Sequence, residues 1–176
     1  PNCWTPSFST KIKEAADIGL FGVKITTNDS LIQLKIKITD TITEPFNELV
    51  LWYGSNTNGY AEISSNSNPV KAEIKTGKNL QLPIKLDTYC QEIQITISRS
   101  KSDVFDLFGI EFNDDLPGIE YHAIGLNGAS AASYNRSTLL NEQLKALNPK
   151  IIILSIGTND AFYYPFSTEW FEHEYS

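Results

Sequence analysis

The chain has 176 residues, a formal net charge of −7, a hydrophobic fraction of 41% and an aromatic fraction of 11%. This length is typical of one or two small domains with buried cores, and no apolar run approaches the roughly 18 residues of a transmembrane helix. The negative charge argues against nucleic acid or an anionic membrane as a partner, because both require a basic surface.

Residues 18–113 have the pattern of an all-β region, with short alternating runs between turns rich in Asn, Ser, Asp and Gly. In the run LIQLKIKI at 31–38, apolar residues occupy every even position, which predicts a strand with one buried face. Eight such strands predict a two-sheet antiparallel sandwich of the jelly-roll kind. The predicted strands are Leu20–Thr26, Leu31–Thr39, Glu48–Tyr53, Tyr60–Ser64, Val70–Lys75, Leu80–Leu86, Glu92–Ser98 and Phe105–Asn113.

Sandwich modules of this kind often bind carbohydrate, and aromatic rings are the groups that would do so. A flat ring packs against sugar C–H groups, and the tyrosine hydroxyl adds a polar contact. The candidates are Trp4, Trp52 and Tyr60, with Tyr53 and Tyr89 as further aromatic residues of the same region. Trp52 lies in an apolar run, so a place in the core is the alternative for it.

Cys3 and Cys90 lie far apart in the sequence and form no CxxC motif. They either pair as a disulfide or are separate small hydrophobic residues, and the sequence leaves both possibilities open. Only His122 and His173 accompany them. Neither a metal site nor a cofactor is therefore expected.

The segment Asp114-Asp115-Leu116-Pro117-Gly118 interrupts the β pattern and predicts a domain boundary. We expect residues 1–115 to form the sandwich, resembling a carbohydrate-binding module, and residues 116–176 to form part of an α/β domain. The acidic pair is expected to be a solvated turn.

The second part predicts a βαβ unit. Strands are expected at the apolar runs Ile119–Leu126 and Ile151–Ile156. Residues 151–154 have no polar alternation, which is typical of a parallel strand covered on both faces. The helix Ser137–Leu147 between them has leucines spaced to face one side, with Ser137 as its N-cap. Proline at 149 ends it, because the residue before a proline disfavours the α conformation.

Parallel strands in such a unit end at the same edge of the sheet, where open α/β sheets bind ligands. The loops at Gly128 and at Gly157–Asp160 are therefore expected to lie together. A glycine N–H and an asparagine side-chain amide both stabilise an oxyanion, which suits acyl transfer. The alternative is that Gly128 and Asn159 only form turns.

These residues also carry a family resemblance. Gly157-Thr158-Asn159-Asp160 after an apolar strand resembles the GxND block of the SGNH (GDSL-type) esterase and lipase family, and Asn127-Gly128-Ala129 resembles its glycine block. The interval between the two blocks is similar to the interval in the family. The resemblance implies that the Gly128 N–H and the Asn159 side chain are oxyanion donors and that the nucleophilic serine's own N–H is a third.

The runs IGLNGASAASYN and QLKALNPKIIILSIGTNDAF are similar to the branch of this family that contains peptidoglycan and polysaccharide O-acetylesterases. In that branch a β-rich domain interrupts the catalytic domain between the serine and glycine blocks. The resemblance implies an exported esterase that acts on acetylated polysaccharide or peptidoglycan by serine attack, without a cofactor.

No GDS-type serine block precedes these motifs in the chain, and no DxxH block follows them. We therefore expect this chain to be a central fragment, with the nucleophile and its His and Asp in the remainder of the parent chain. Ser130, Ser133 and Ser137 are expected to be loop or cap residues. The alternative function is a carbohydrate-binding or structural β-sandwich module without catalysis.

Overall fold

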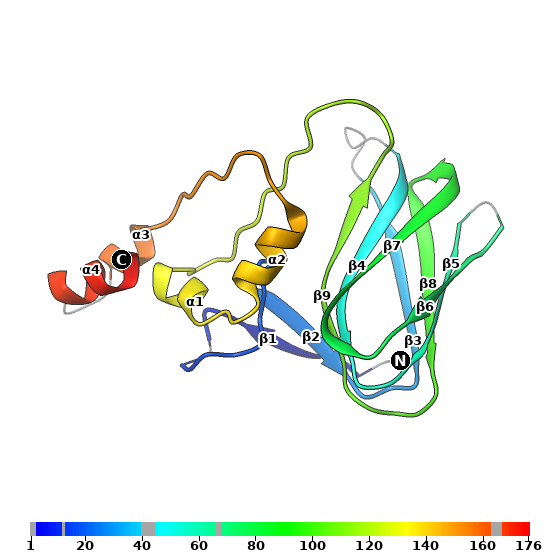
Figure 1. Cartoon of the computed structure of the whole chain (residues 1–176), viewed down its shortest axis with the longest axis horizontal. Coiled ribbons are helices and arrows are strands. Elements are labelled where there is room, and N and C mark those ends of the chain that lie inside the picture. The colour runs from blue at the N-terminus through cyan, green and yellow to red at the C-terminus, as the bar shows by residue number, and fades with distance from the viewer. Residues whose placement is uncertain (1–2, 12, 40–44, 66–67, 163–166) are drawn as a thin grey trace. The chain divides into compact units, whose positions relative to one another are not determined.

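A computed structural model describes residues 3–11, 13–39, 45–65, 68–162 and 167–176, and Figure 1 labels their strands and helices. The strands are β1 (Thr5–Phe8), β2 (Val23–Thr27), β3 (Leu31–Lys37), β4 (Phe46–Ser55), β5 (Gly59–Ser64), β6 (Val70–Ile74), β7 (Gly77–Cys90), β8 (Glu92–Arg99) and β9 (Phe105–Asn113). The helices are α1 (Ala131–Asn135), α2 (Leu140–Leu147), α3 (Thr158–Ala161) and α4 (Thr168–Tyr175).

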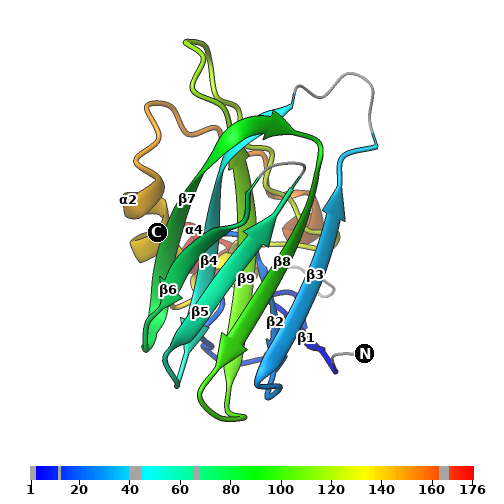
Figure 2. The same cartoon turned by 90° about the vertical axis from the view of Figure 1, so that its right-hand side faces the viewer.

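The strands form two sheets that face each other. One has the order β1-β2-β9-β4-β7 and the other the order β3-β8-β5-β6. Figure 2 shows β3, β8, β5 and β6 side by side, with β4 and β9 behind them. Strand β8 pairs antiparallel with both of its neighbours, so that Ile95 lies opposite Leu34 of β3 and Ile63 of β5. The predicted antiparallel sandwich, accompanied by helices, is confirmed.

Alternating side chains of both sheets fill the core. Ile93, Ile95 and Ile97 of β8 are at most 1% exposed, because every second residue of a strand faces the same side. From the other sheet, the buried Tyr53 ring stacks on Phe105 with 5.8 Å between the ring centroids. All eight predicted strands are present with somewhat different ends, whereas β1, which has no alternating pattern, was not predicted.

Arg99, only 7% exposed, joins two loops at one end of the sandwich. Its guanidinium donates to the carbonyl oxygens of Asp103 at 2.6 Å and Val104 at 3.2 Å, and also to the carbonyl oxygen of Asp29. It lies over the Phe105 ring, 5.4 Å from the centroid. Five N–H donors in one rigid plane allow a single side chain to serve both loops.

Both cysteines are free thiols, which selects the unpaired alternative. Cys90 is 4% exposed and belongs to the sandwich core, and burial raises the pKa of its thiol. Cys3 is exposed. Cys90 therefore acts as a small hydrophobic residue.

The chain divides into two compact units, and one of them is built from two separate segments. The sandwich unit contains Pro1–Thr5 and Ile25–Glu120, and the helical unit contains Pro6–Lys24 and Tyr121–Ser176. The strand pattern did not indicate that residues 6–24 belong with the helices. The domain boundary between residues 115 and 116 stays a prediction.

A buried glutamine attaches the segment 6–24 to α2. The side chain of Gln143 is fully buried, and its Oε1 accepts a hydrogen bond of 2.8 Å from the Leu20 N–H. A Cβ atom placed on Gly19 would lie 1.8 Å from the same oxygen. Glycine at position 19 therefore provides the space that the Gln143 amide occupies.

The predicted parallel pairing of residues 119–126 with residues 151–156 is not formed. Among the residues that the structure describes, neither segment has a strand partner, and both run as irregular chain. Ile151, Ile153 and Leu154 are 80%, 82% and 78% exposed. The prediction of strands here is wrong, because a strand needs neighbouring backbone to complete its hydrogen bonds as well as an apolar pattern.

The predicted helix also begins later than expected, at Leu140, and Ser137 is not its N-cap. Ser137 instead forms an isolated parallel bridge with Ala16, and the next N–H, from Thr138, donates to the Ala16 carbonyl at 3.0 Å. Pairing with the N-terminal segment thus replaces the first helical turn. The predicted end is confirmed, because Asn148 is the C-cap with a left-handed φ of 51°.

The acidic turn after β9 is bonded to β7. The Asp115 carboxylate accepts hydrogen bonds from the Tyr89 hydroxyl and, at 3.1 Å, from the Lys85 ammonium. Lys85 also bonds Glu48 of β4 at 2.7 Å. The Tyr89 hydroxyl, followed by Lys85, lowers the pKa of Asp115 from 3.8 to about 2.

We expect Gly19→Ala and Gln143→Ala to interact strongly. Gly19→Ala alone displaces the Gln143 amide and should cost about 1–3 kcal/mol of unfolding free energy. In a Gln143→Ala background the space is free, so the same change should cost at least about 1 kcal/mol less. Urea unfolding followed by circular dichroism measures both. Gly125→Ala is the matched control, because a Cβ there meets nothing within 4 Å; simple additivity would contradict the account.

We also expect the Asp115 linkage to weaken in acid. Because folding lowers the Asp115 pKa, the ionised form is favoured in the folded chain, and the associated stability is complete above the ordinary pKa of 3.8. It is lost as the pH falls from 3.8 towards about 2. Carboxyl NMR titration should place the Asp115 midpoint near this lower value, and Tyr89→Phe should raise it. A wild-type midpoint at 3.8 would show that the hydrogen bonds are not formed.

Candidate oxyanion site

The first predicted donor, Gly128, lies in the loop that precedes α1. It is exposed and has a left-handed φ of +81°. The next N–H, from Ala129, closes a turn by donating to the Leu126 carbonyl at 3.0 Å. A Cβ at Gly128 would meet nothing within 4 Å, so the backbone conformation is the reason for glycine here.

The second predicted donor, Asn159, lies on the one-turn helix α3, which follows the left-handed Gly157. Its side-chain Nδ2 donates to the Ala129 carbonyl at 2.8 Å. Ala129 is the residue directly after Gly128. The structure therefore brings the two predicted loops together, although the strands that were expected to place them are absent. An amide nitrogen carries two hydrogens, so this bond orients the group and uses one of them.

Asp160, which follows Asn159, is fully buried. Its carboxylate accepts from the Ala131 N–H at 3.0 and 3.4 Å and from the Tyr175 hydroxyl at 3.1 Å. A buried carboxylate requires such donors, because an unpaired one carries a large desolvation cost. This residue was part of the recognised motif, but its partners could not be read from the sequence.

The serines after Gly128 cap α1 and form hydrogen bonds with its backbone. Ser130 is the N-cap and forms a capping box with Ser133, in which each side chain bonds the other residue's N–H at 3.3 Å. The buried Ser137 hydroxyl donates to the Ser133 carbonyl at 3.1 Å. These contacts agree with structural roles for all three serines.

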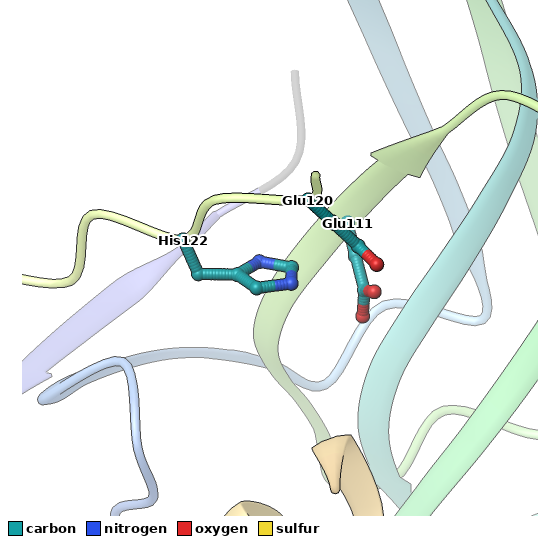
Figure 3. A group of neighbouring side chains, drawn as sticks. All are labelled: Glu111, Glu120 and His122. Carbon is teal, nitrogen blue, oxygen red and sulfur yellow. The ribbon is translucent and has the colours of Figure 1, made fainter. Parts of the chain in front are cut away.

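The histidines lie outside this site. His173 of α4 is exposed, and its Nδ1 is 3.6 Å from the Glu174 carboxylate. Figure 3 shows His122 with Glu111 and Glu120, but His122 belongs to the helical unit and both glutamates to the sandwich unit. Glu111 accepts hydrogen bonds from Trp52 and from Asn113 within its own unit, which explain its position.

The aromatic candidates for sugar binding differ in exposure. Trp52 is 2% exposed, and its indole N–H donates to Glu111 at 3.0 Å, so it presents no open ring face. Trp4 is partly buried and packs against the sandwich core. Tyr60 is 54% exposed, and the Lys71 ammonium lies 4.4 Å from its ring centroid. Tyr60 is therefore the most accessible of the three predicted residues.

The two sheets and their helices define an antiparallel β-sandwich with an appended helical unit, and a peptidoglycan O-acetylesterase has a similar fold. The TM-score is 0.70 at 19% sequence identity, over 99% of this chain and 46% of that protein. The chain thus spans about half of the length of the esterase.

Two further solved structures are similar at lower TM-scores. TmCBM61 in complex with β-1,4-galactotriose has a TM-score of 0.40 and 10% sequence identity. The match covers 64% of this chain and 88% of the TmCBM61 chain. A family two carbohydrate esterase from Cellvibrio japonicus has a TM-score of 0.33 and 11% sequence identity. The match covers 65% of this chain and 36% of the esterase chain. No protein-family model and no curated protein matches the chain.

Among the described residues, no helix is long and apolar enough to cross a membrane.

Proposed function

We propose that this chain is the central portion of an exported SGNH-type ester hydrolase that removes O-acetyl groups from peptidoglycan or another polysaccharide. The observation that carries the proposal is the hydrogen bond between the Asn159 amide and the Ala129 carbonyl, 2.8 Å long. It joins the two sequence blocks that resemble the oxyanion motifs of that family. The fold shared with a peptidoglycan O-acetylesterase over 99% of this chain supports the same assignment.

In the proposed reaction, a serine from the remainder of the parent chain attacks the acetyl carbonyl after a histidine accepts its proton. The carbonyl oxygen becomes an oxyanion, which the Gly128 N–H and the free hydrogen of the Asn159 amide stabilise. Collapse of this intermediate breaks the bond between the acetyl carbon and the sugar oxygen, and that oxygen takes the proton from the histidine and leaves as a hydroxyl. Water then hydrolyses the acetyl-serine and releases acetate.

The exposed apolar segment 151–156 agrees with a chain that is part of a larger fold. Ile151, Ile153 and Leu154 are each at least 78% exposed, although consecutive apolar residues of this kind are typical of a strand buried on both faces. We propose that strands of the remaining parent chain pair with this segment and cover it. The same remainder would supply the serine, aspartate and histidine.

The first test is Asn159→Ala in the full-length parent protein. Loss of one oxyanion donor should lower kcat by about 10²- to 10³-fold and leave KM nearly unchanged, because the contact is made in the transition state. Acetate release from O-acetylated peptidoglycan measures both constants.

Asn141→Ala is the matched control for this test. Asn141 is exposed on α2 and belongs to neither of the two loops that carry the proposed donors. We expect its kcat to equal that of the wild type. A wild-type kcat for Asn159→Ala would exclude the oxyanion role.

Carbohydrate binding by the sandwich, with or without catalysis, is the second candidate function. The specific observation is the Tyr60 ring, which is 54% exposed and has the Lys71 ammonium over one of its two faces. An exposed ring can pack against sugar C–H groups, and an ammonium can donate to sugar hydroxyls.

If this is correct, Tyr60→Ala should weaken binding of a polysaccharide to the 176-residue chain by about tenfold, the loss expected for one stacking contact. Tyr60→Phe keeps the ring and should bind almost as well as the wild type. Isothermal titration calorimetry against a panel of polysaccharides measures the dissociation constants. Equal affinities for the wild type and Tyr60→Ala would place the binding surface elsewhere.

A further inference from the structure

We propose that Asp160 and Tyr175 are positioning residues that hold the oxyanion donors in place before substrate binds. This inference rests on the proposed function, because it concerns the same donors. It assigns to the end of α4 a role that the sequence motifs do not supply.

The first step is the link from Asp160 to the glycine loop. Its buried carboxylate accepts the Ala131 N–H at 3.0 and 3.4 Å. Asp160 adjoins Asn159 on α3, and Ala131 lies three residues after Gly128. Fixing Asp160 against Ala131 therefore fixes the separation of the two proposed donors. The bond from Asn159 to the Ala129 carbonyl depends on the same alignment.

The second step is the link from Asp160 to α4. The Tyr175 hydroxyl donates to Asp160 Oδ2 at 3.1 Å. A Cβ atom placed on Gly157 would lie 3.4 Å from the Tyr175 hydroxyl oxygen. Gly157 has a φ of +118°, which side chains other than that of glycine rarely allow. The hydroxyl thus rests against the turn that begins α3.

Other contacts hold the end of α4 in turn. The Tyr175 ring stacks on Phe171 with 4.4 Å between the centroids. The Asn135 amide of α1 donates to the Glu174 carbonyl and carboxylate, at 2.9 Å in each case. Tyr175 is 42% exposed, and partial desolvation of its hydroxyl, followed by the hydrogen bond to Asp160, raises its pKa.

The result is a continuous chain of contacts from α4 through Asp160 to α1 and both loops. An oxyanion site accelerates a reaction only if its donors are already aimed when the charge develops. A carboxylate that accepts one backbone N–H and one hydroxyl sets this alignment without touching the substrate. Asp160 and Tyr175 therefore act through Asn159 and Gly128.

The test is a double-mutant cycle in the full-length parent protein. Asp160→Ala should lower kcat about 10²-fold with little change in KM, as expected for misplaced donors. Asp160→Asn keeps an acceptor for the Ala131 N–H, so its kcat should fall less than the kcat of Asp160→Ala. Tyr175→Phe removes one hydroxyl only and should lower kcat about tenfold. In an Asn159→Ala background, each change should lower kcat by a smaller factor than in the wild type, because only the Gly128 donor is then left to be misplaced.

Amide hydrogen exchange provides a readout that does not depend on activity. Exchange at Ala131 should become at least about tenfold faster in Asp160→Ala and in Tyr175→Phe, since its acceptor is lost or released. Asn141→Ala is the control, because Asn141 is exposed on α2 and lies outside the contacts that hold Asp160. It should leave both kcat and the Ala131 exchange rate unchanged.

The outcomes separate this inference from the proposed function. Full additivity with Asn159→Ala, or unchanged Ala131 exchange in both variants, would overturn the positioning role while the esterase assignment stands. A wild-type parent without esterase activity would overturn the proposed function, and with it the effect on kcat proposed for Asp160 and Tyr175. Non-additive kcat losses with faster Ala131 exchange would support both.

Discussion

The buried carboxylate of Asp160 is the constraint on which the candidate site depends. Without strands at 119–126 and 151–156, the chain has no sheet edge to align its two loops. The alignment comes instead from a fully buried charge that accepts the Ala131 N–H and the Tyr175 hydroxyl. A buried carboxylate tolerates few alternative arrangements, because moving away from either donor leaves it unpaired. One side chain thus keeps Asn159 beside the glycine loop.

The sandwich and the helical unit are stabilised by different kinds of interaction. Strands of the sandwich are specified by the alternation of apolar and polar residues. In β8, for example, Ile93, Ile95 and Ile97 form one almost completely buried face. The helical unit has short helices and depends on single buried polar groups such as Gln143 and Asp160. An apolar core tolerates volume-conserving exchange, whereas a buried amide or carboxylate requires particular partners. We therefore expect the helical unit to be the more sensitive to single polar substitutions.

This difference explains what could be predicted from the sequence. The alternation of LIQLKIKI and similar runs indicated eight of the nine strands, and the GTND and NGA motifs indicated which loops meet. The attachment of residues 6–24 could not be predicted, because it depends on hydrogen bonds between residues far apart in the sequence, such as those from Leu20 to Gln143 and from Thr138 to Ala16. The segment 151–156 has the composition of a buried strand, but pairing also requires a neighbour, which composition does not describe. Local pattern predicts elements, whereas long-range polar contacts decide how they meet.

The most direct test of the central claim is NMR of the full-length parent protein after a fluorophosphonate has labelled its serine. The phosphonyl oxygen of the labelled serine occupies the position of the oxyanion. The amide protons that donate to it should therefore shift when the label binds. The account predicts large downfield shifts of one Asn159 side-chain amide proton and of the Gly128 backbone amide proton, with little change at Asn135. Complete serine labelling with both the Asn159 and Gly128 resonances unmoved would contradict the assignment of this site as an oxyanion hole.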